Sequence, residues 1–229
     1  MIRILSTAGT EFRIALRNRW VAIAMVLMAV FSMVLSLAGS APTGGLGVDR
    51  LSVTVASLTS LSVYLIPLLA LLMSFDAIAG ETERGTLPLL LAYPIARWEI
   101  LLGKLIAHLA ILTLAVLLGH GLAAGVAIYS DQTSLAGLPA LWRLSWSSIL
   151  LGATFLGAGY ALSALSRRPS GAAGLAIGLW LGLVVLSDLA LLTAIVADTG
   201  GWFTTDAFPI ALLANPADAF RLFNLTASG

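Results

Sequence analysis

Long apolar runs, separated by short stretches that carry nearly all of the charge, dominate the pattern of this chain. A bilayer-spanning helix needs about 20 mostly apolar residues, and five runs approach or exceed that length. They cover 20–37, 51–75, 105–129, 144–166 and 171–197. Pro67 lies in the second run and predicts a kink, because proline removes a backbone hydrogen bond. The pattern predicts an all-α polytopic membrane protein with five transmembrane helices.

Residues 1–19 precede the first run and have a different pattern. Their large apolar residues recur at helical spacing, and their arginines fall largely on other faces. The apolar residues are Ile2, Leu5, Phe12 and Leu16, and the arginines include Arg13, Arg17 and Arg19. This pattern predicts an amphipathic helix lying in the membrane interface. A positive topology signal with no helix of its own is the alternative.

Composition agrees with a membrane protein and excludes several chemistries. Hydrophobic residues make up 59% of the 229 residues and charged residues 10%, against about a quarter charged in soluble domains. The net charge of +1, with no basic stripe, gives no indication of nucleic-acid binding. Cysteine is absent, which excludes disulfides, thiolate metal ligands and thiol catalysis. Gly103-Lys104 lacks the remainder of a P-loop, so no nucleotide site or enzyme activity is expected on this chain.

The distribution of positive charge predicts the orientation. Nine of the twelve Lys and Arg residues precede the first run or lie in the gaps after the second and fourth runs. The positive-inside rule therefore places the N-terminus and the 81–104 segment in the cytoplasm of a bacterial inner-membrane protein. The single transmembrane domain, 1–229, would then have 198–229 on the outer side.

The 81–104 segment reads ETERGTLPLLLAYPIARWEILLGK and interrupts two apolar runs with charges and prolines. Pro88 is compatible with the first turn of a short helix over 86–92, and Pro94 ends that helix. A new helix is expected to start near Arg97 and to continue into the third span. Two interpretations remain open: a helix that docks on a partner, or a loop whose leucines rest on the membrane.

Three parts of this segment resemble the first cytoplasmic loop of type-2 ABC transporter permeases: Glu81-Thr-Glu-Arg-Gly-Thr-Leu87, Leu89-Leu-Leu-Ala-Tyr-Pro94, and Arg97 through Gly103-Lys104. In that family the loop is a coupling helix that docks on a separate ATPase, which binds ATP and Mg²⁺, and residues 1–19 correspond to an elbow helix. The resemblance implies no cofactor or metal on this chain. It implies ATPase contacts at Glu81, Glu83, Arg84, Gly85, Thr86, Leu87, Leu89, Leu90 and Leu91, and at Arg167 and Arg168.

Within that family, the 76–104 stretch and Asn215-Pro-Ala-Asp-Ala-Phe-Arg-Leu-Phe223 are similar to permeases serving nitrous oxide reductase maturation. This likeness implies a homodimer, a cytoplasmic ATPase, a periplasmic partner, and copper or sulfur supply. The family has six spans, so 198–229 is expected to precede a sixth helix missing from this sequence, unless the chain is a shortened form. A generic drug or lipid exporter, an ion-coupled secondary transporter and a passive scaffold are the alternatives.

A few residues inside the spans are candidates for special roles. Asp188 is a gating or substrate candidate, because charges within spans are costly, although structural pairing is the alternative. Gly174, Gly178 and Gly182 form a small-residue face suited to dimer packing. Two histidines and three methionines are weaker metal-ligand candidates, more typical of helix packing: His108, His120, Met25, Met28 and Met33.

Overall fold

The computed structural model describes residues 2–17, 19–38, 50–92, 95–130 and 132–226, and every regular element in these ranges is helical. Four helices are long and apolar enough to cross a membrane, and a fifth span is present if the bent pair at the N-terminus is counted as one. The prediction of an all-α polytopic membrane protein is confirmed.

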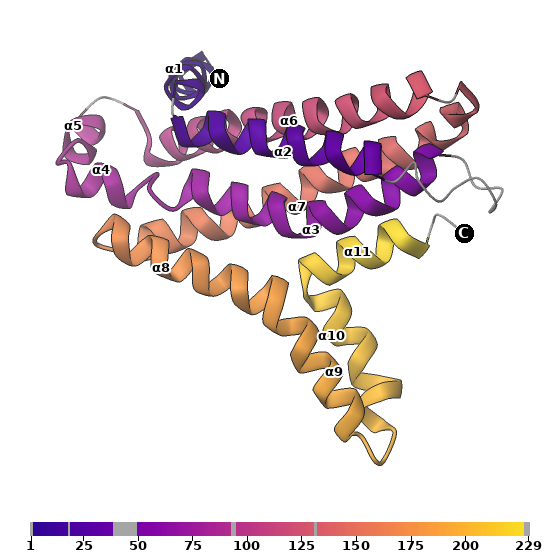
Figure 1. Cartoon of the computed structure of the whole chain (residues 1–229). Coiled ribbons are helices and arrows are strands. Elements are labelled where there is room, and N and C mark those ends of the chain that lie inside the picture. Colours follow the sequence, from indigo (N-terminus) through magenta and orange to yellow (C-terminus); the bar gives the residue numbers. More distant parts are fainter. Residues whose placement is uncertain (1, 18, 39–49, 93–94, 131, 227–229) are drawn as a thin grey trace.

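Four long helices lie side by side and form the body of the molecule (Figure 1). They are α2 (Arg19–Ala38), α3 (Arg50–Ser74), α6 (Arg97–Ser130) and α7 (Leu138–Leu165). Their shared core is made of large side chains that are almost completely buried, among them Leu58, Ile66, Ile111 and Phe155. Pro67 lies inside α3, and the helix continues past it. The 3-10 helix η2 (Gln132–Gly137) leads from α6 into α7.

The N-terminal helix α1 (Ile2–Leu16) lies across one end of this body, at 74° to α2 (Figure 1). Ala8 and Ala15 are buried and Phe12 packs against the core, whereas Leu5 and Leu16 are exposed. The apolar residues predicted for a single face are therefore divided between protein contact and an outward surface. Small residues, rather than the leucines, allow α1 to approach the bundle closely.

At the same end, α4 (Ala79–Glu83) and α5 (Leu87–Ala92) connect α3 to α6. The prediction of a short helix over 86–92, followed by a helix starting near Arg97, is confirmed by the bounds of α5 and α6. Pro94 itself lies outside the described residues. A third connection at this end, between α7 and α8 (Pro169–Trp180), contains Arg167 and Arg168.

The C-terminal third extends away from the body and returns to it (Figure 1). Helix α8 continues through the π-helical turn η3 (Leu181–Leu186) into α9 (Ser187–Ala197), and hardly any residue along this span is buried. The chain returns through η4 (Phe203–Ala207) and α10 (Phe208–Ala214), and α11 (Pro216–Thr226) packs on α3 and α7. The 198–229 region thus contains only short helices in its described part.

Candidate functional site

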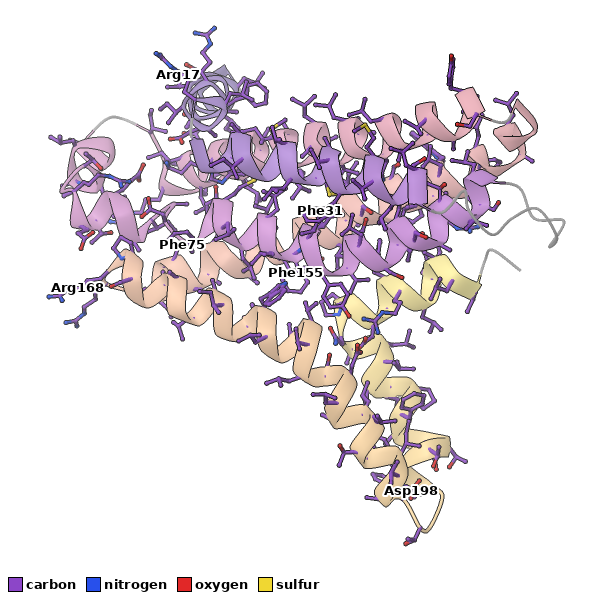
Figure 2. The ribbon with its side chains drawn as sticks, in the orientation of Figure 1. Arg17, Phe31, Phe75, Phe155, Arg168 and Asp198 are labelled. Atoms are coloured by element: carbon purple, nitrogen blue, oxygen red, sulfur yellow. The ribbon has the colours of Figure 1, made fainter. Side chains whose placement is uncertain are left out.

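Three segments that are distant in sequence lie at one end of the bundle: the N-terminal helix α1, the α4–α5 segment (79–92) and the α7–α8 turn (Figures 1 and 2). Most of the residues singled out from the sequence lie here, so this end is the candidate functional site. The α4–α5 segment is short, and helices of five or six residues have little stability of their own. Its geometry must therefore come from contacts with the long helices.

The start of α4 is fixed by a side chain from another helix. Ser163 of α7 accepts hydrogen bonds through its Oγ from the backbone N–H groups of Ile78 and Ala79, each at 3.0 Å. The first N–H groups of a helix have no partner within the helix, and the residue at the usual capping position, Ile78, has no side-chain acceptor. Ser163 is completely buried, so it supplies the missing cap from outside and fastens α4 to α7.

The end of α4 is fixed by a glycine turn. Gly85 has a φ of +68°, in the left-handed region that favours glycine. The Thr86 N–H donates to the Glu81 carbonyl at 3.0 Å and the Gly85 N–H to the Thr82 carbonyl at 3.2 Å. This pair of bonds is the Schellman arrangement, which closes a helix and turns the chain. Gly85 therefore sets the angle between α4 and α5.

Helix α5 projects from the bundle with an exposed apolar side chain. The Leu89 side chain is 66% exposed, Pro88 and Ala92 are also exposed, and Leu87 is half-buried. The side chains of Leu90 and Leu91 lie outside the described residues. Pro88, Leu89 and Ala92 together give α5 an outward apolar surface, and contiguous apolar surfaces of this kind mark contact sites.

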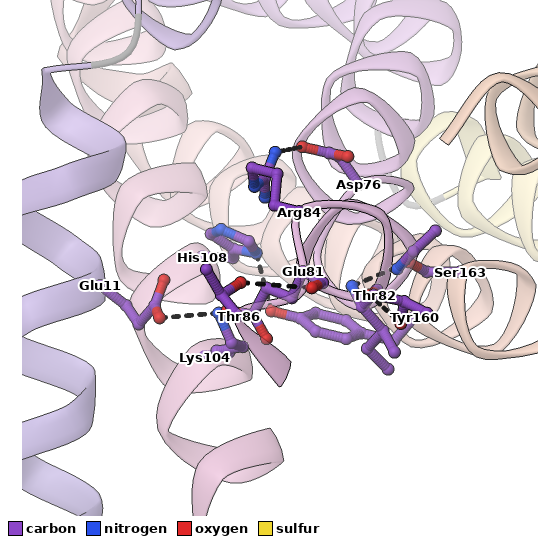
Figure 3. Close-up of polar contacts among 12 residues, drawn as sticks. Glu11, Asp76, Glu81, Thr82, Arg84, Thr86, Lys104, His108, Tyr160 and Ser163 are labelled. Carbon is purple, nitrogen blue, oxygen red and sulfur yellow. Dashed lines mark hydrogen bonds and ion pairs between the residues drawn. The ribbon is translucent and has the colours of Figure 1, made fainter. Parts of the chain in front are cut away.

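The charged residues of the segment divide into an inward and an outward group. Glu81 points inward, where its carboxylate lies 2.6 Å from the Lys104 ammonium (Figure 3). Arg84 lies outward and pairs with Asp76 at 3.4 Å, with both side chains exposed. Glu83 and Thr86 are exposed, as are Arg167 and Arg168 of the neighbouring turn. The structure thus brings the outward group to one surface, and separates Glu81 from it.

Sequence reasoning missed three residues of this end: Glu11, Lys104 as an ion-pair partner, and Ser163. Lys104 contacts Glu11 of α1 at 2.7 Å as well as Glu81. The only available signal was that a lysine seven residues inside a long helix needs a partner when it is buried. Nothing in the sequence indicates that the partner is Glu11, which lies 93 positions away.

The two histidines of α6 occupy separate packing sites. The Nδ1 of His108 lies 2.8 Å from the Tyr160 hydroxyl (Figure 3), whereas the His120 ring is held between the hydroxyls of Ser62 and Ser145, at 3.2 and 3.1 Å. Met28 is buried in the core and Met33 is exposed. Among the described residues, no three His, Cys, Asp or Glu side chains come together as in a metal site.

Asp188 is part of a polar cluster at the π-helical turn. Its carboxylate pairs with Arg221 of α11, and Arg221 also lies 3.7 Å from Asp218. Asn215 caps α11 and donates through Nδ2 to the Leu183 carbonyl in η3, at 2.7 Å. Burial, together with the nearby charge of Asp188, raises the pKa of Asp218. The cluster fastens α11 to the turn between α8 and α9.

The glycine face on the fifth span is open. No atom of another element lies within 4 Å of the Cβ position at Gly174, Gly178 or Gly182. The glycines that do permit close helix contact within the chain are elsewhere. At Gly159 of α7 the Cβ position is occupied by the Ser74 hydroxyl of α3, and at Gly103 of α6 it lies 2.8 Å from Thr7 of α1.

Comparison with known proteins places the chain in a family. A family model described as ABC-2 family transporter protein matches residues 5–228. The chain belongs to the ABC-2 transporter family. This membership confirms the resemblance to type-2 ABC permeases that the 81–104 segment carries, and identifies the chain as a membrane subunit of an ABC transporter.

Two permeases that share one name are similar to almost the whole of this chain. The first, "Probable ABC transporter permease protein NosY" of Pseudomonas aeruginosa, is 45% identical over 221 residues, which are 96% of this chain and 80% of the relative. The second, from Stutzerimonas stutzeri, is 44% identical over 228 residues, which are 99% of this chain and 82% of the relative.

Proposed function

We propose that the α4–α5 segment is the surface by which this permease couples to ATP hydrolysis in a separate cytoplasmic ATPase. One observation carries the proposal: α5 exposes Leu89 while both ends of α4 are fixed, by the Ser163 cap and by the Gly85 turn. A segment that is exposed but rigidly held transmits displacement to the helices on either side of it. Arg167 and Arg168 of the adjoining turn provide a second contact, and ATP and Mg²⁺ bind to the ATPase.

The proposal includes an orientation. The end with α1 and the α4–α5 segment lies in the cytoplasm of a bacterial inner-membrane protein, with α1 as an elbow helix at the membrane interface. This orientation is supported by the nine cationic residues predicted for one side. The exposed Arg13, Arg17, Arg84, Arg167 and Arg168 belong to elements gathered at this end. The 198–229 region then lies on the periplasmic side, where a NosD-like partner would contact it.

The physiological role proposed is maturation of nitrous oxide reductase. A homodimer of this chain, together with a NosF-like ATPase, forms the transporter, and the transporter supplies copper or sulfur for the copper centre of the reductase. The support is the 45% and 44% identity to two proteins named NosY. A permease deletion strain complemented with this chain provides the test. The copper content of its purified reductase should be restored, and a reductase that still lacks copper despite normal permease levels would favour a generic exporter.

The coupling itself is tested with a matched pair of substitutions. Leu89→Asp is expected to abolish copurification of the ATPase in mild detergent, because it places a charge at the centre of an apolar contact. Leu135→Asp is the control, since Leu135 is 54% exposed but lies in η2 at the opposite end of the bundle. Undiminished copurification with Leu89→Asp would exclude α5 as the docking helix.

A further inference from the structure

The Gly103-Lys104 pair is part of the family-like sequence pattern, yet neither residue is among those assigned to ATPase contact. Lys104 is not a surface residue: its side chain is 7% exposed, against 58% for Arg84 in the neighbouring segment. A lysine kept in such a place needs a structural reason, because burying an ammonium without a partner is costly. The contacts of these two residues supply the reason.

Gly103 is the point at which α1 crosses α6. A Cβ at this position would lie 2.8 Å from the Cβ and Cγ2 of Thr7 and 3.2 Å from the Ile4 carbonyl oxygen. Real side chains do not approach so closely, so only glycine allows α1 to rest against α6 here. The crossing brings the third turn of α1 alongside Lys104.

Lys104 then joins three elements through one ammonium group (Figure 3). Its Nζ lies 2.7 Å from the Glu11 carboxylate of α1 and 2.6 Å from the Glu81 carboxylate of α4. The two carboxylates are 20% and 13% exposed. Charge-assisted bonds of this length in a shielded place are stronger than surface ion pairs. Without the ammonium, two carboxylates would face one another, which is strongly unfavourable.

We infer that Lys104 is a positioning residue that fixes α1 to the α4–α5 segment, so that the two move as one body during the transport cycle. The inference rests on the proposed function, because the ATPase supplies the movement. Its consequence is specific: α1 is a driven part of the coupling apparatus, and not only an anchor in the membrane interface. The distance between α1 and α5 stays constant while both move, together with the start of α6, relative to the other helices of the bundle.

The joint is tested by spin-label distance measurement on the full-length protein in lipid nanodiscs. Thr10→Cys on α1 and Ala92→Cys on α5 are both exposed sites, and the chain contains no cysteine of its own, so only these two positions are labelled. The parent protein is expected to give one narrow distance distribution, unchanged between the nucleotide-free and the ATP–vanadate-trapped ATPase complex.

Three substitutions and a control separate the joint from general folding. Glu11→Gln removes only the α1 link and leaves the Lys104–Glu81 pair, so it is expected to broaden the distribution and make it nucleotide-dependent while the ATPase still copurifies. Lys104→Met is expected to do the same, and Lys104→Arg to restore the parent result. Arg13→Gln removes an exposed charge from the same helix as Glu11, outside the residues assigned to ATPase contact, and is expected to leave the distribution unchanged.

An unchanged distribution in Glu11→Gln, with the ATPase still bound, would overturn the inference. Failure of the proposed function looks different. In that case the parent protein binds no ATPase. The spin-label distance distribution of the isolated permease still broadens in Glu11→Gln when Lys104 links α1 to α4. If Lys104→Met does not fold, the comparison of Glu11→Gln with Arg13→Gln still tests whether the Glu11–Lys104 link joins α1 to the segment.

Discussion

Arg221 of α11 donates through Nη1 to both carboxylate oxygens of Asp188, at 3.0 and 3.1 Å. Asp188 is therefore paired, in agreement with the structural alternative that the sequence left open for it. The partner comes from the segment that follows the fifth span, and the pair lies directly after the π-helical turn. A gating or substrate role for Asp188 stays a prediction, which substitution of either partner tests.

Breaking this pair is expected to lower stability modestly. Asp188→Asn and Arg221→Gln should each cost about 1 kcal/mol, since both side chains keep some contact with solvent. The double variant should cost less than the sum of the two single ones, because both single variants remove the Asp188–Arg221 contact. Thermal unfolding in detergent measures all three. Strictly additive effects would show that the two residues act independently.

Ser163→Ala is expected to loosen the α4–α5 segment. The substitution leaves the Ile78 and Ala79 N–H groups without their acceptor, at a cost of about 1–2 kcal/mol. Hydrogen exchange at 78–83 should accelerate, and ATPase copurification should weaken. Ser60→Ala is the control, because its hydroxyl is exposed and bonds only within its own helix. Equal protection of 78–83 in both variants would contradict the capping role.

Gly85→Ala is expected to destabilise the turn between α4 and α5 by about 1 kcal/mol, because alanine is strained at a φ of +68°. Gly85→Asn should be milder, since asparagine tolerates this conformation better. Gly157→Ala is the matched control: nothing lies within 4 Å of that Cβ position in α7, so helix propensity should make it neutral or stabilising. Thermal unfolding and ATPase binding of the three variants provide the measurement.

Gly178→Leu is expected to leave the fold of the single chain intact, because the position is open. If the glycine face packs against a second copy, as the family resemblance implies, the variant should remain folded but become monomeric. Light scattering of the detergent-solubilised protein reads the mass. Gly121→Leu offers a control on another helix, α6, likewise with open space around it. A dimer that survives Gly178→Leu would place the interface elsewhere.

Much of the helical layout follows from local sequence. Pro88 lies in the first turn of α5 as predicted, and α6 begins at Arg97 as predicted. The other apolar runs coincide with the long helices to within a few residues, except that α7 begins at Leu138, earlier than predicted. These helix bounds depend on the hydrophobic pattern and on backbone chemistry, so they can be predicted from local sequence. The position of one helix relative to another depends on contacts between distant residues, and local sequence does not predict it.

The interior of the candidate site shows this limit. Glu81 was grouped with its exposed neighbours because adjacent residues share a motif, although it turns inward to Lys104. The glycine face at Gly174, Gly178 and Gly182 drew attention by its regular spacing, while the close helix crossings at Gly103 and Gly159 have no such spacing. Contacts of this kind depend on three-dimensional approach between elements far apart in sequence.

The uninterrupted length of α6 has a consequence for how the protein sits in its membrane. Its 34 residues extend about 51 Å, against a hydrocarbon thickness of about 30 Å. With the hydrocarbon centred on α6, about 10 Å of the helix projects at each end, and Lys104, about 10 Å from the start at Arg97, then lies at the margin of the hydrocarbon. Sliding of α6 along its axis would move Lys104 and its partners, Glu11 and Glu81, into the hydrocarbon core of the bilayer. These charges therefore set the depth of the helix, and we expect the strain on them to vary with bilayer thickness.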